Sequence, residues 1–508
     1  MSDQRNGDCD QDRAESPSKS MRVRPDSDRK LPAADRSVWA LSIAVWVAGC
    51  APVAVSVAEA PAVSVSGALE RWVDASTPEG GDGSSPRPFK RLGDALAPGA
   101  LVHLRSGLYA GPWVLPAGVR LIGHGEVVLF GEGETTVVTA PAGASLEALS
   151  VQGGFVGMRA IGPVTLKRVH FSGHRRVAIE AQGALTLEDS LLDGSIPDTR
   201  GVELKKGSTA KLKKVRFVGA FGRAVDADGA QLDAEDLQSE GPAQALHLEN
   251  SQSEVRKLTV AGGSGPGVFV AEGALTLSDA SVNGHEFGLQ ARKAALTLVR
   301  FTSRRVQLAG IATVQCTGSF SEILTEHSGS YGGLQLLLST LKVKGVKVKQ
   351  ASAMGIFVRQ GEVKLEDVTV EQIRGEGPVL GESDGDGLHL RDADVEASNV
   401  TVRDAQGSGV FASAGARVAL KGFTCERCRV GALVAELASV VSVKGMISRG
   451  TEGPAVAVLD RAALSLEDAD ITAQQAPIWA ECDQGARVTV KRLKSNLPLP
   501  LSGCIARD

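Results

Sequence analysis

The chain is poor in aromatic residues, which make up 4% of its 508 positions and include two tyrosines and five tryptophans. A long sugar-binding cleft usually presents more aromatic platforms than this. Long hydrophobic runs are also scarce, because the one strongly apolar stretch, residues 37–49, is shorter than the roughly 20 residues of a membrane-spanning helix. Neither sign of charge dominates, since 55 basic and 59 acidic residues leave a net charge of −4 without a basic block. Nucleic acid is therefore not an expected partner.

What the sequence does contain is a repeat. The stretch Gly267–Phe287, GVFVAEGALTLSDASVNGHEF, holds two short alternating apolar runs, a small polar turn and a third run. Related runs begin, mostly about 22 residues apart, at Gly157, Arg176, Gly201, Gly222, Ala245, Gly267, Gly288, Gly310, Gly333, Gly355, Gly387, Gly409, Gly431, Ala455 and Ile478. A fixed period of this size indicates a solenoid, in which each coil contacts only its neighbours. The length of the chain then does not imply several domains.

The apolar pattern predicts strands. Val268 and Val270 alternate with other residues, as do Leu275 and Leu277, and a period of two is typical of strands with one buried face. The signatures of leucine-rich repeats and of hexapeptide left-handed β-helices are missing. Three short strands per coil of about 22 residues therefore predict an all-β, right-handed parallel β-helix.

A row of charged dipeptides supports this register. After the second run of each repeat the sign alternates, from Lys213-Lys214 to Glu235-Asp236 to Arg256-Lys257, and the alternation continues along most of the chain. In a stack of coils these turns would lie about 4.8 Å apart, so each charge would sit between two of opposite sign. We interpret the row as a device that fixes the register of the coils, because exposed pairs contribute little stability individually.

With these features the chain resembles the right-handed β-helix proteins of the pectate-lyase-like superfamily over roughly residues 71–508. Residues 80–96, GGDGSSPRPFKRLGDAL, and 118–123, GVRLIG, resemble the N-terminal module of many such proteins, here residues 71–156, with a short capping helix near Phe89–Leu96. Coils would fill residues 157–508. The resemblance implies a fold but no single activity, because this superfamily contains lyases, hydrolases and adhesins. The tripeptide Gly123–Gly125, GHG, is interpreted as a turn.

The N-terminal segments suggest export. Residues 1–36 are polar and are expected to be a disordered or leader segment, although Met21 is an alternative start. Residues 37–50 resemble a bacterial lipoprotein signal ending in Val47-Ala48-Gly49-Cys50, which implies a lipid on Cys50 and a membrane attachment through it. Ala51, which follows this cysteine, resembles the outer-membrane class of bacterial lipoproteins, and residues 51–70 would then be the tether. The alternative to a cleaved lipoprotein signal is that the apolar stretch remains as an uncleaved membrane anchor.

Export permits disulfides. Cys482 and Cys504 are 22 residues apart, one coil, so they should stack at a distance compatible with a disulfide. Cys425 and Cys428 form a CxxC, for which a local disulfide or two free thiols is a simpler interpretation than a redox or zinc site, since no nearby ligands complete one. Cys316 has no predicted disulfide partner.

Candidate ligand-binding residues lie in the outward column of the first run. This column includes Arg159, Glu203, His247, Phe269, Gln290, Gln335, Phe357, His389 and Phe411, and in the lyases that the chain resembles the matching sheet carries the substrate groove. Phe, His and Gln in a row could hold a sugar chain, although exposed strand positions favour aromatic residues anyway. The 32-residue interval adds a loop within Gly375–Gly387 that carries Glu376, Glu382, Asp384 and Asp386.

This acidic loop leads into the strand of His389. Glu382, Asp384 and Asp386 could bind Ca²⁺ or act as an acid/base pair, or they could simply be a solvated loop. We expect any ligand to bind there, among Asp384, Asp386 and His389 with Phe357 and Phe411 one coil away. The two hypotheses for the whole chain are a non-catalytic, surface-anchored scaffold that binds a polysaccharide or a surface protein, and a polysaccharide lyase or hydrolase.

Overall fold

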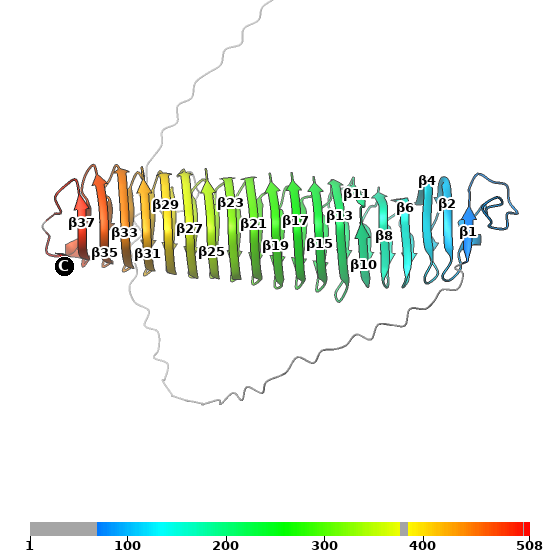
Figure 1. Cartoon of the computed structure of the whole chain (residues 1–508), viewed down its shortest axis with the longest axis horizontal. Helices are drawn as coiled ribbons and strands as arrows, with labels where there is room; N and C mark the ends of the chain where they lie inside the picture. Colours follow the sequence, from blue (N-terminus) through cyan, green and yellow to red (C-terminus); the bar gives the residue numbers. More distant parts are fainter. Residues whose placement is uncertain (1–68, 376–384, 501, 508) are drawn as a thin grey trace, which may run out of the picture. The chain divides into compact units, whose positions relative to one another are not determined.

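The computed structural model describes residues 69–375, 385–500 and 502–507. Cys50, Glu376, Glu382 and Asp384 lie outside these residues. The described part is a parallel β-solenoid of about 18 turns with about 22 residues per coil, so the predicted fold class is confirmed (Figure 1). Among the described helices, none is long and apolar enough to cross a membrane.

Two long parallel sheets make up the solenoid. The first sheet consists of β1 (Glu70–Val73), β2 (Leu101–Ala110), β4 (Arg120–Gly131), β6 (Ala144–Gly153), β8 (Val164–Ser172), β10 (Ala184–Glu188), β11 (Leu191–Gly194), β13 (Thr209–Gly219), β15 (Gln231–Glu240), β17 (Gln252–Ala261), β19 (Ala274–Asn283), β21 (Ala295–Val306), β23 (Thr317–Ser328), β25 (Thr340–Lys349), β27 (Glu362–Ile373), β29 (Asp394–Ala405), β31 (Arg417–Glu426), β33 (Val440–Thr451), β35 (Ala463–Ala473), β37 (Arg487–Ser495) and β38 (Ile505–Arg507).

The second sheet contains the short runs that mark each repeat in the sequence. Its strands are β3 (Trp113–Val114), β5 (Thr136–Ala140), β7 (Val156–Ala160), β9 (Val177–Ala181), β12 (Arg200–Leu204), β14 (Arg223–Asp228), β16 (Gln244–Glu249), β18 (Val268–Ala271), β20 (Phe287–Arg292), β22 (Ala309–Val314), β24 (Gly332–Leu337), β26 (Met354–Arg359), β28 (Asp386–Arg391), β30 (Ser408–Ser413), β32 (Gly431–Ala435), β34 (Val456–Val458) and β36 (Ile478–Ala480).

The three expected strands per coil appear as one short strand and one long, bent strand. In β19, Asp279 has a φ of 56° and interrupts the extended backbone between Leu277 and Ala280. A left-handed residue changes the direction of a strand, so each half of the long strand forms a wall of its own. In one coil the two halves are separate strands, β10 and β11, with Asp189 between them at a φ of 49°.

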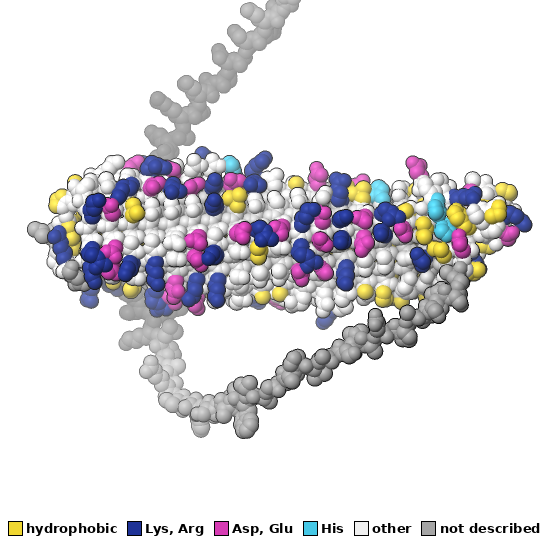
Figure 2. Space-filling model, in the orientation of Figure 1, with side chains coloured by type: hydrophobic (Ala, Val, Ile, Leu, Met, Phe, Trp, Pro, Cys, Tyr) yellow, Lys and Arg dark blue, Asp and Glu magenta, His cyan; other side chains and the backbone are white. Residues whose placement is uncertain are grey.

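The charged dipeptides lie at this bend and stack as predicted. Lys213 pairs with Glu235 across neighbouring strands, and their charged atoms are 3.6 Å apart. Lys257 Nζ lies 2.8 Å from Asp236 Oδ2 on the preceding coil. Figure 2 shows basic and acidic side chains alternating over the face that presents the first sheet. The second residue of each pair also adopts the left-handed conformation, at Lys214, Asp236 and Lys257 for example, which the sequence pattern did not reveal.

The glycine that begins many repeats is required by close packing across the interior. A Cβ added to Gly310 would lie 2.4 Å from the side chain of Thr325, and one added to Gly355 would lie 2.4 Å from that of Val370. The wall of short strands therefore touches the opposite wall at this position. Since any side chain there would push the walls apart, the repeated glycine sets the narrow width of the coil.

Both ends of the solenoid differ from the middle. At the N-terminal end the expected capping helix is the single turn α1 (Leu92–Ala95). Gly123–Gly125, which the sequence suggested to be a turn, lies within β4, although the register shifts there and Gly125 has a φ of 88°. Near the C-terminal end, the 3₁₀ turn η1 (Cys482–Gln484) carries Cys482, which forms a disulfide with Cys504 at a Cα–Cα distance of 5.3 Å.

Candidate functional site

The outward column predicted from the sequence is a continuous row on the second sheet. The pairing register joins, on successive strands, Arg159, Glu180, Glu203, Asp226, His247, Phe269, Gln290, Ala312, Gln335, Phe357, His389 and Phe411. Neighbours in this row are one strand spacing apart, about 4.8 Å. The row divides into a charged part toward the N-terminus and an aromatic part toward the C-terminus.

The aromatic part is a histidine cluster made of Phe357, Asp386, His389 and Phe411. The His389 ring stacks on Phe411 with centroids 4.8 Å apart and meets Phe357 edge-on at 5.3 Å. Its Nδ1 lies 2.9 Å from Asp386 Oδ2. His389 and Asp386 are both fully buried, whereas the two phenylalanines are half-buried. His389 therefore has no surface with which to contact a ligand in this structure, and its two phenylalanine neighbours form the accessible part.

The sequence suggested that Asp386 belongs to the inserted loop. In the structure it is instead the first residue of a strand. It begins β28, pairs in register with Met354, and accepts a 2.6 Å hydrogen bond from the backbone N–H of Ser408 at Oδ1. Both of its oxygens are thus engaged within the fold. No group of three or more metal-ligating side chains converges anywhere in residues 69–375, 385–500 and 502–507. The expected Ca²⁺ ligands Glu382 and Asp384 lie outside those residues, so the calcium site stays a prediction.

One further carboxyl group lies near the histidine cluster. Burial raises the pKa of Glu436, which follows β32, and the charges of Asp460 and Asp386 act in the same direction, while His389 and Arg391 oppose them. A carboxyl group with a raised pKa within electrostatic range of an imidazole is a feature of some acid/base sites. The sequence pattern gave no sign of this residue, because its position depends on the turn after β32.

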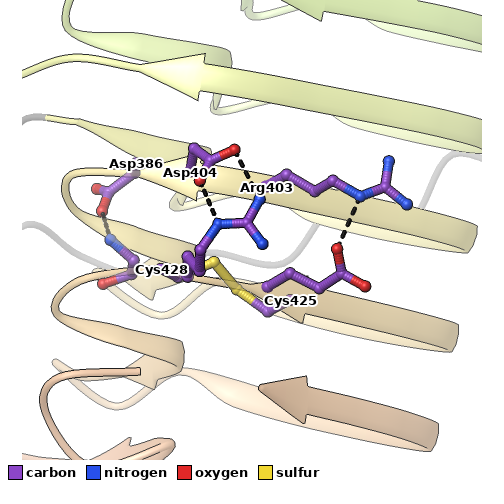
Figure 3. Close-up of a disulfide and its surroundings, with 8 residues drawn as sticks. Asp386, Arg403, Asp404, Cys425 and Cys428 are labelled. Atoms are coloured by element: carbon purple, nitrogen blue, oxygen red, sulfur yellow. Dashed lines mark hydrogen bonds and ion pairs between the residues drawn. A yellow bond between two sulfur atoms is a disulfide. The ribbon is translucent and has the colours of Figure 1, made fainter. Parts of the chain in front are cut away.

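A disulfide lies inside the coil beside this cluster (Figure 3). Cys425 and Cys428 are both fully buried and bonded to each other, with their Cα atoms 6.3 Å apart. The sulfur of Cys425 packs under Gly409 of β30, where a Cβ would approach it to 2.4 Å. Arg403 and Arg427 form ion pairs around the bridge, with Glu426 and Asp404 respectively. The CxxC is a local disulfide in the interior. Cys316 is a free thiol, also buried.

The charged part of the row, which we call the charged ladder, consists of three carboxylates and the cations around them. The carboxylates are Glu180, Glu203 and Asp226, and the cations are Arg159, Arg176, Arg200, Lys205 and Arg223. Arg176 bridges two coils, because its Nη1 lies 3.1 Å from Glu180 Oε2 and its Nη2 lies 3.1 Å from Glu203 Oε2. Arg200 bridges the next two, with Glu203 at 3.1 Å and Asp226 at 2.6 Å.

The electrostatics of the ladder favour the ionised form of Glu180. Burial raises the pKa of Glu180, but the charge of Arg159, the hydrogen bond from Gln182 and the charge of Arg176 outweigh it, so the pKa lies below its ordinary value. Three like charges on adjacent strands would repel one another, and the interleaved guanidinium groups offset this. Within the ladder the five cations outnumber the three carboxylates, while Asp198 and Glu249 add carboxylates at neighbouring positions.

An aromatic platform adjoins the ladder. The rings of His247 and Phe269 stack with centroids 4.7 Å apart and an interplanar angle of 16°, and the guanidinium carbon of Arg292 lies 5.8 Å from the Phe269 centroid. Burial and the charge of Arg223 lower the pKa of His247, which favours a neutral imidazole. Phe269 is half-buried and so presents part of a ring to solvent.

A shallow groove of about 460 Å³ lies beside this platform, between the ends of neighbouring coils. Its lining consists of Asp198, Arg200, Gly222, Arg223, Ala243, Gln244, Ser264 and Gly265. The cations of the ladder therefore border an open hollow as well as their own carboxylates. Of the residues predicted from the sequence, His247 belongs to this region. Gln335 lies half-buried between Ala312 and Phe357, and so adjoins the histidine cluster at Phe357.

The class of protein is thus a parallel β-solenoid with a charged and aromatic row on its second sheet. No family model and no curated protein matches the chain. Similar solved structures include the catalytic unit of a GH87 alpha-1,3-glucanase from Streptomyces thermodiastaticus, at 13% identity and a TM-score of 0.30, covering 78% of this chain and 66% of that one. The chain thus spans just under two thirds of that glucanase unit.

Two further solved structures are similar to the chain at the same level. They are pectate lyase Pel9A, at 12% identity and a TM-score of 0.24, covering 77% of this chain and 79% of that one, and PfbA, a surface adhesin of Streptococcus pneumoniae, at 9% identity and a TM-score of 0.25, covering 72% and 86%. With TM-scores this low, none of them bears on the activity of this chain.

Proposed function

We propose that this protein is a non-catalytic binding solenoid that holds an acidic polysaccharide along the outer face of its second sheet. The observation that carries the proposal is the charged ladder, whose five cations surround three carboxylates beside the His247–Phe269 platform and the groove of about 460 Å³. Guanidinium groups match carboxylate and sulfate oxygens, and a half-exposed ring can stack on a sugar face. Arg176 commits two of its five N–H groups to the ladder, which leaves donors for a ligand.

The state of the carboxylates argues for binding and against hydrolysis at the ladder. Hydrolysis of a glycosidic bond needs one carboxylic acid that stays protonated near neutral pH. Glu180 has a lowered pKa, so it does not supply that acid. Glu203 and Asp226 are each held by two or more cations, and their role here is to orient the guanidinium groups.

The alternative function, a polysaccharide lyase or hydrolase, is favoured by one observation. Glu436 has a pKa raised by burial and lies in the electrostatic range of Asp386, His389 and Arg391. A Glu436→Gln substitution separates the two functions, because it removes a general acid while leaving the ladder untouched. Product release from acidic glycans that is present in the wild type and lost in Glu436→Gln would support the enzyme.

The binding test compares two arginine–carboxylate pairs on different walls. Arg223 pairs with Asp226 in the ladder at 3.0 Å, and Arg417 forms a pair with Asp394 of the first sheet at 2.6 Å. Glycan arrays and calorimetry with acidic and neutral polysaccharides should show that Arg223→Gln weakens acidic-glycan binding roughly tenfold or more, since a hydrogen bond to a charged group contributes about 1.5–3 kcal/mol. Arg417→Gln is the matched control and should bind normally.

Phe269→Ala should also weaken binding, and raised salt should weaken it for the wild type. Equal affinity of the Arg223 and Arg417 variants, or tighter binding of neutral glycans, would contradict the proposal.

Ca²⁺ at the inserted loop is part of the same proposal as a second, separate contact for an acidic ligand. Glu382 and Asp384 supply the hard oxygen ligands that this ion prefers. Asp386 is unsuitable for a mutational test because it is buried and hydrogen-bonded to Ser408. Calorimetry should therefore compare the wild type with the double variant Glu382→Ala, Asp384→Ala. Equal Ca²⁺ binding by both would exclude the loop.

We also propose that the protein works in the bacterial cell envelope, attached to the outer membrane through a lipid on Cys50. The support is the sequence Val47-Ala48-Gly49-Cys50, which resembles a lipoprotein signal, together with two disulfides, which suit an oxidising compartment. Metabolic labelling with a fatty acid should label the wild type and not Cys50→Ala. Equal labelling of both would refute the anchor.

A further inference from the structure

Three aromatic side chains form a compact stack at the N-terminal end of the first sheet. Trp72 on β1, His103 on β2 and His124 on β4 come from three successive strands. The indole lies parallel to both imidazoles, with centroids 4.5 Å from His103 and 5.1 Å from His124. Histidine and hydrophobic side chains gather at this end in Figure 2. His124 is exposed, so the stack opens to solvent.

The two imidazoles point ring nitrogens at each other. His103 Nδ1 lies 2.8 Å from His124 Nε2. The other nitrogen of His103, Nε2, lies 3.4 Å from Glu70 Oε1 but makes no hydrogen bond to any described residue. Glu70 therefore acts on the pair as a nearby negative charge, which favours a cation at this position.

The separation of the nitrogens matches two adjacent ligands of one metal ion. Metal–imidazole bonds are about 2.0–2.1 Å long, so two ligands at a right angle have nitrogens about 2.9 Å apart, whereas tetrahedral ligands would have them about 3.3 Å apart. The observed 2.8 Å fits the right angle. Square-planar or tetragonal sites of this kind are typical of Cu²⁺ and Ni²⁺, and tetrahedral ones of Zn²⁺.

From this geometry we propose that His103 and His124 form a surface chelate for a tetragonal divalent transition metal, Cu²⁺ before Ni²⁺ and both before Zn²⁺. The protein supplies two nitrogens, and water fills the remaining positions on the exposed side. The absence of a convergent group of three ligands among the described residues agrees with an open site of two protein ligands.

The guanidinium of Arg105, whose carbon lies 5.6 Å from the Trp72 centroid, pairs with Asp74 at 3.4 Å. Arg105 therefore does not face the stack as an isolated charge.

Trp72 provides a direct reporter, because Cu²⁺ quenches the fluorescence of an indole that it approaches closely. The full chain, purified without a polyhistidine tag, is titrated with CuCl₂, NiCl₂ and ZnCl₂ at pH 7.5, and the Cu²⁺ complex is examined by electron paramagnetic resonance. We expect saturable quenching by one Cu²⁺ per chain and a tetragonal spectrum with two nitrogen ligands. Trp72→Phe should remove the quenched component while calorimetry still detects Cu²⁺ binding.

Four variants test the assignment. His124→Ala, at an exposed position, and His103→Gln should each weaken Cu²⁺ binding tenfold or more. Glu70→Gln should weaken it less, because it removes only a nearby negative charge. His327→Ala, an exposed histidine in a distant coil, is the matched control and should bind Cu²⁺ normally. Unquenched Trp72 fluorescence, or Cu²⁺ binding that survives both His124→Ala and His103→Gln, would show that the pair is only hydrogen-bonded and would overturn the proposal.

Discussion

His174 should make one coil of the solenoid sensitive to acid. Its side chain is only 6% exposed, at the turn between β8 and β9, where it packs against Phe171 with ring centroids 5.9 Å apart. Nδ1 donates a hydrogen bond to the carbonyl oxygen of Gly153. Burial lowers the pKa of His174 from 6.5 to about 4, although backbone hydrogen bonds to Gly153 and Val151 oppose the shift.

The direction of the effect follows from the two pKa values. The unfolded chain takes up a proton at His174 as the pH falls through 6.5, whereas the folded coil takes it up only near 4. Stability is therefore unaffected above pH 6.5, falls between 6.5 and about 4, and levels off below. The whole difference corresponds to about 3 kcal/mol, or roughly a hundredfold in the opening equilibrium.

Hydrogen exchange measures this change locally, which suits a solenoid whose coils can open separately. Peptides that cover β8 and β9 should lose roughly a hundredfold of protection between pH 6.5 and 4, after correction for the intrinsic exchange rate. His174→Gln should remove most of that loss, because glutamine does not titrate. His170→Gln, on the same coil but half-buried, is the control. Equal losses of protection in the wild type and in His174→Gln would refute the reasoning.

Three other predictions concern stability. Asp236→Lys should lower the Tm slightly and Asp236→Asn should lower it less, because the pair with Lys257 is exposed and contributes no more than about 1 kcal/mol. High salt should shrink the difference, and a larger drop for Asp236→Asn would contradict the stacking of the charged dipeptides. A non-reduced digest of exported protein should link Cys482 to Cys504, and reduction should cost the last coils about 3 kcal/mol of protection against exchange; free alkylation of both thiols would exclude the bridge. Asp386→Ala should destabilise β28 and β30 by roughly 3 kcal/mol or more in thermal unfolding, since it leaves buried donors without their acceptor, and an unchanged Tm would contradict its burial.

The candidate sites differ in how far the sequence could predict them. The row from Arg159 to Phe411 was predictable, since residues one coil apart become neighbours once the period is known. Glu180 and Asp226 belong to the same row. They were missed because the starts of their repeats, Arg176 and Gly222, were assigned two residues before the positions that pair with the repeat glycine Gly201. The pair His103 and His124 was missed because the N-terminal module does not keep the period, and GHG was interpreted as a turn.

The repeat in the sequence was sufficient to predict the fold. Alternation with a period of two specified strands, the period of about 22 residues specified their stacking, and the alternating charges specified the register, because each of these signals repeats in every coil. The burial of each polar side chain and its contacts became known only from the three-dimensional structure. His389 and Phe357 are neighbours in the outward column of the sequence, yet His389 is fully buried and Phe357 is half-buried. The reason is physical: depth depends on turns and neighbouring side chains that differ from coil to coil, and a repeat carries no information about what differs.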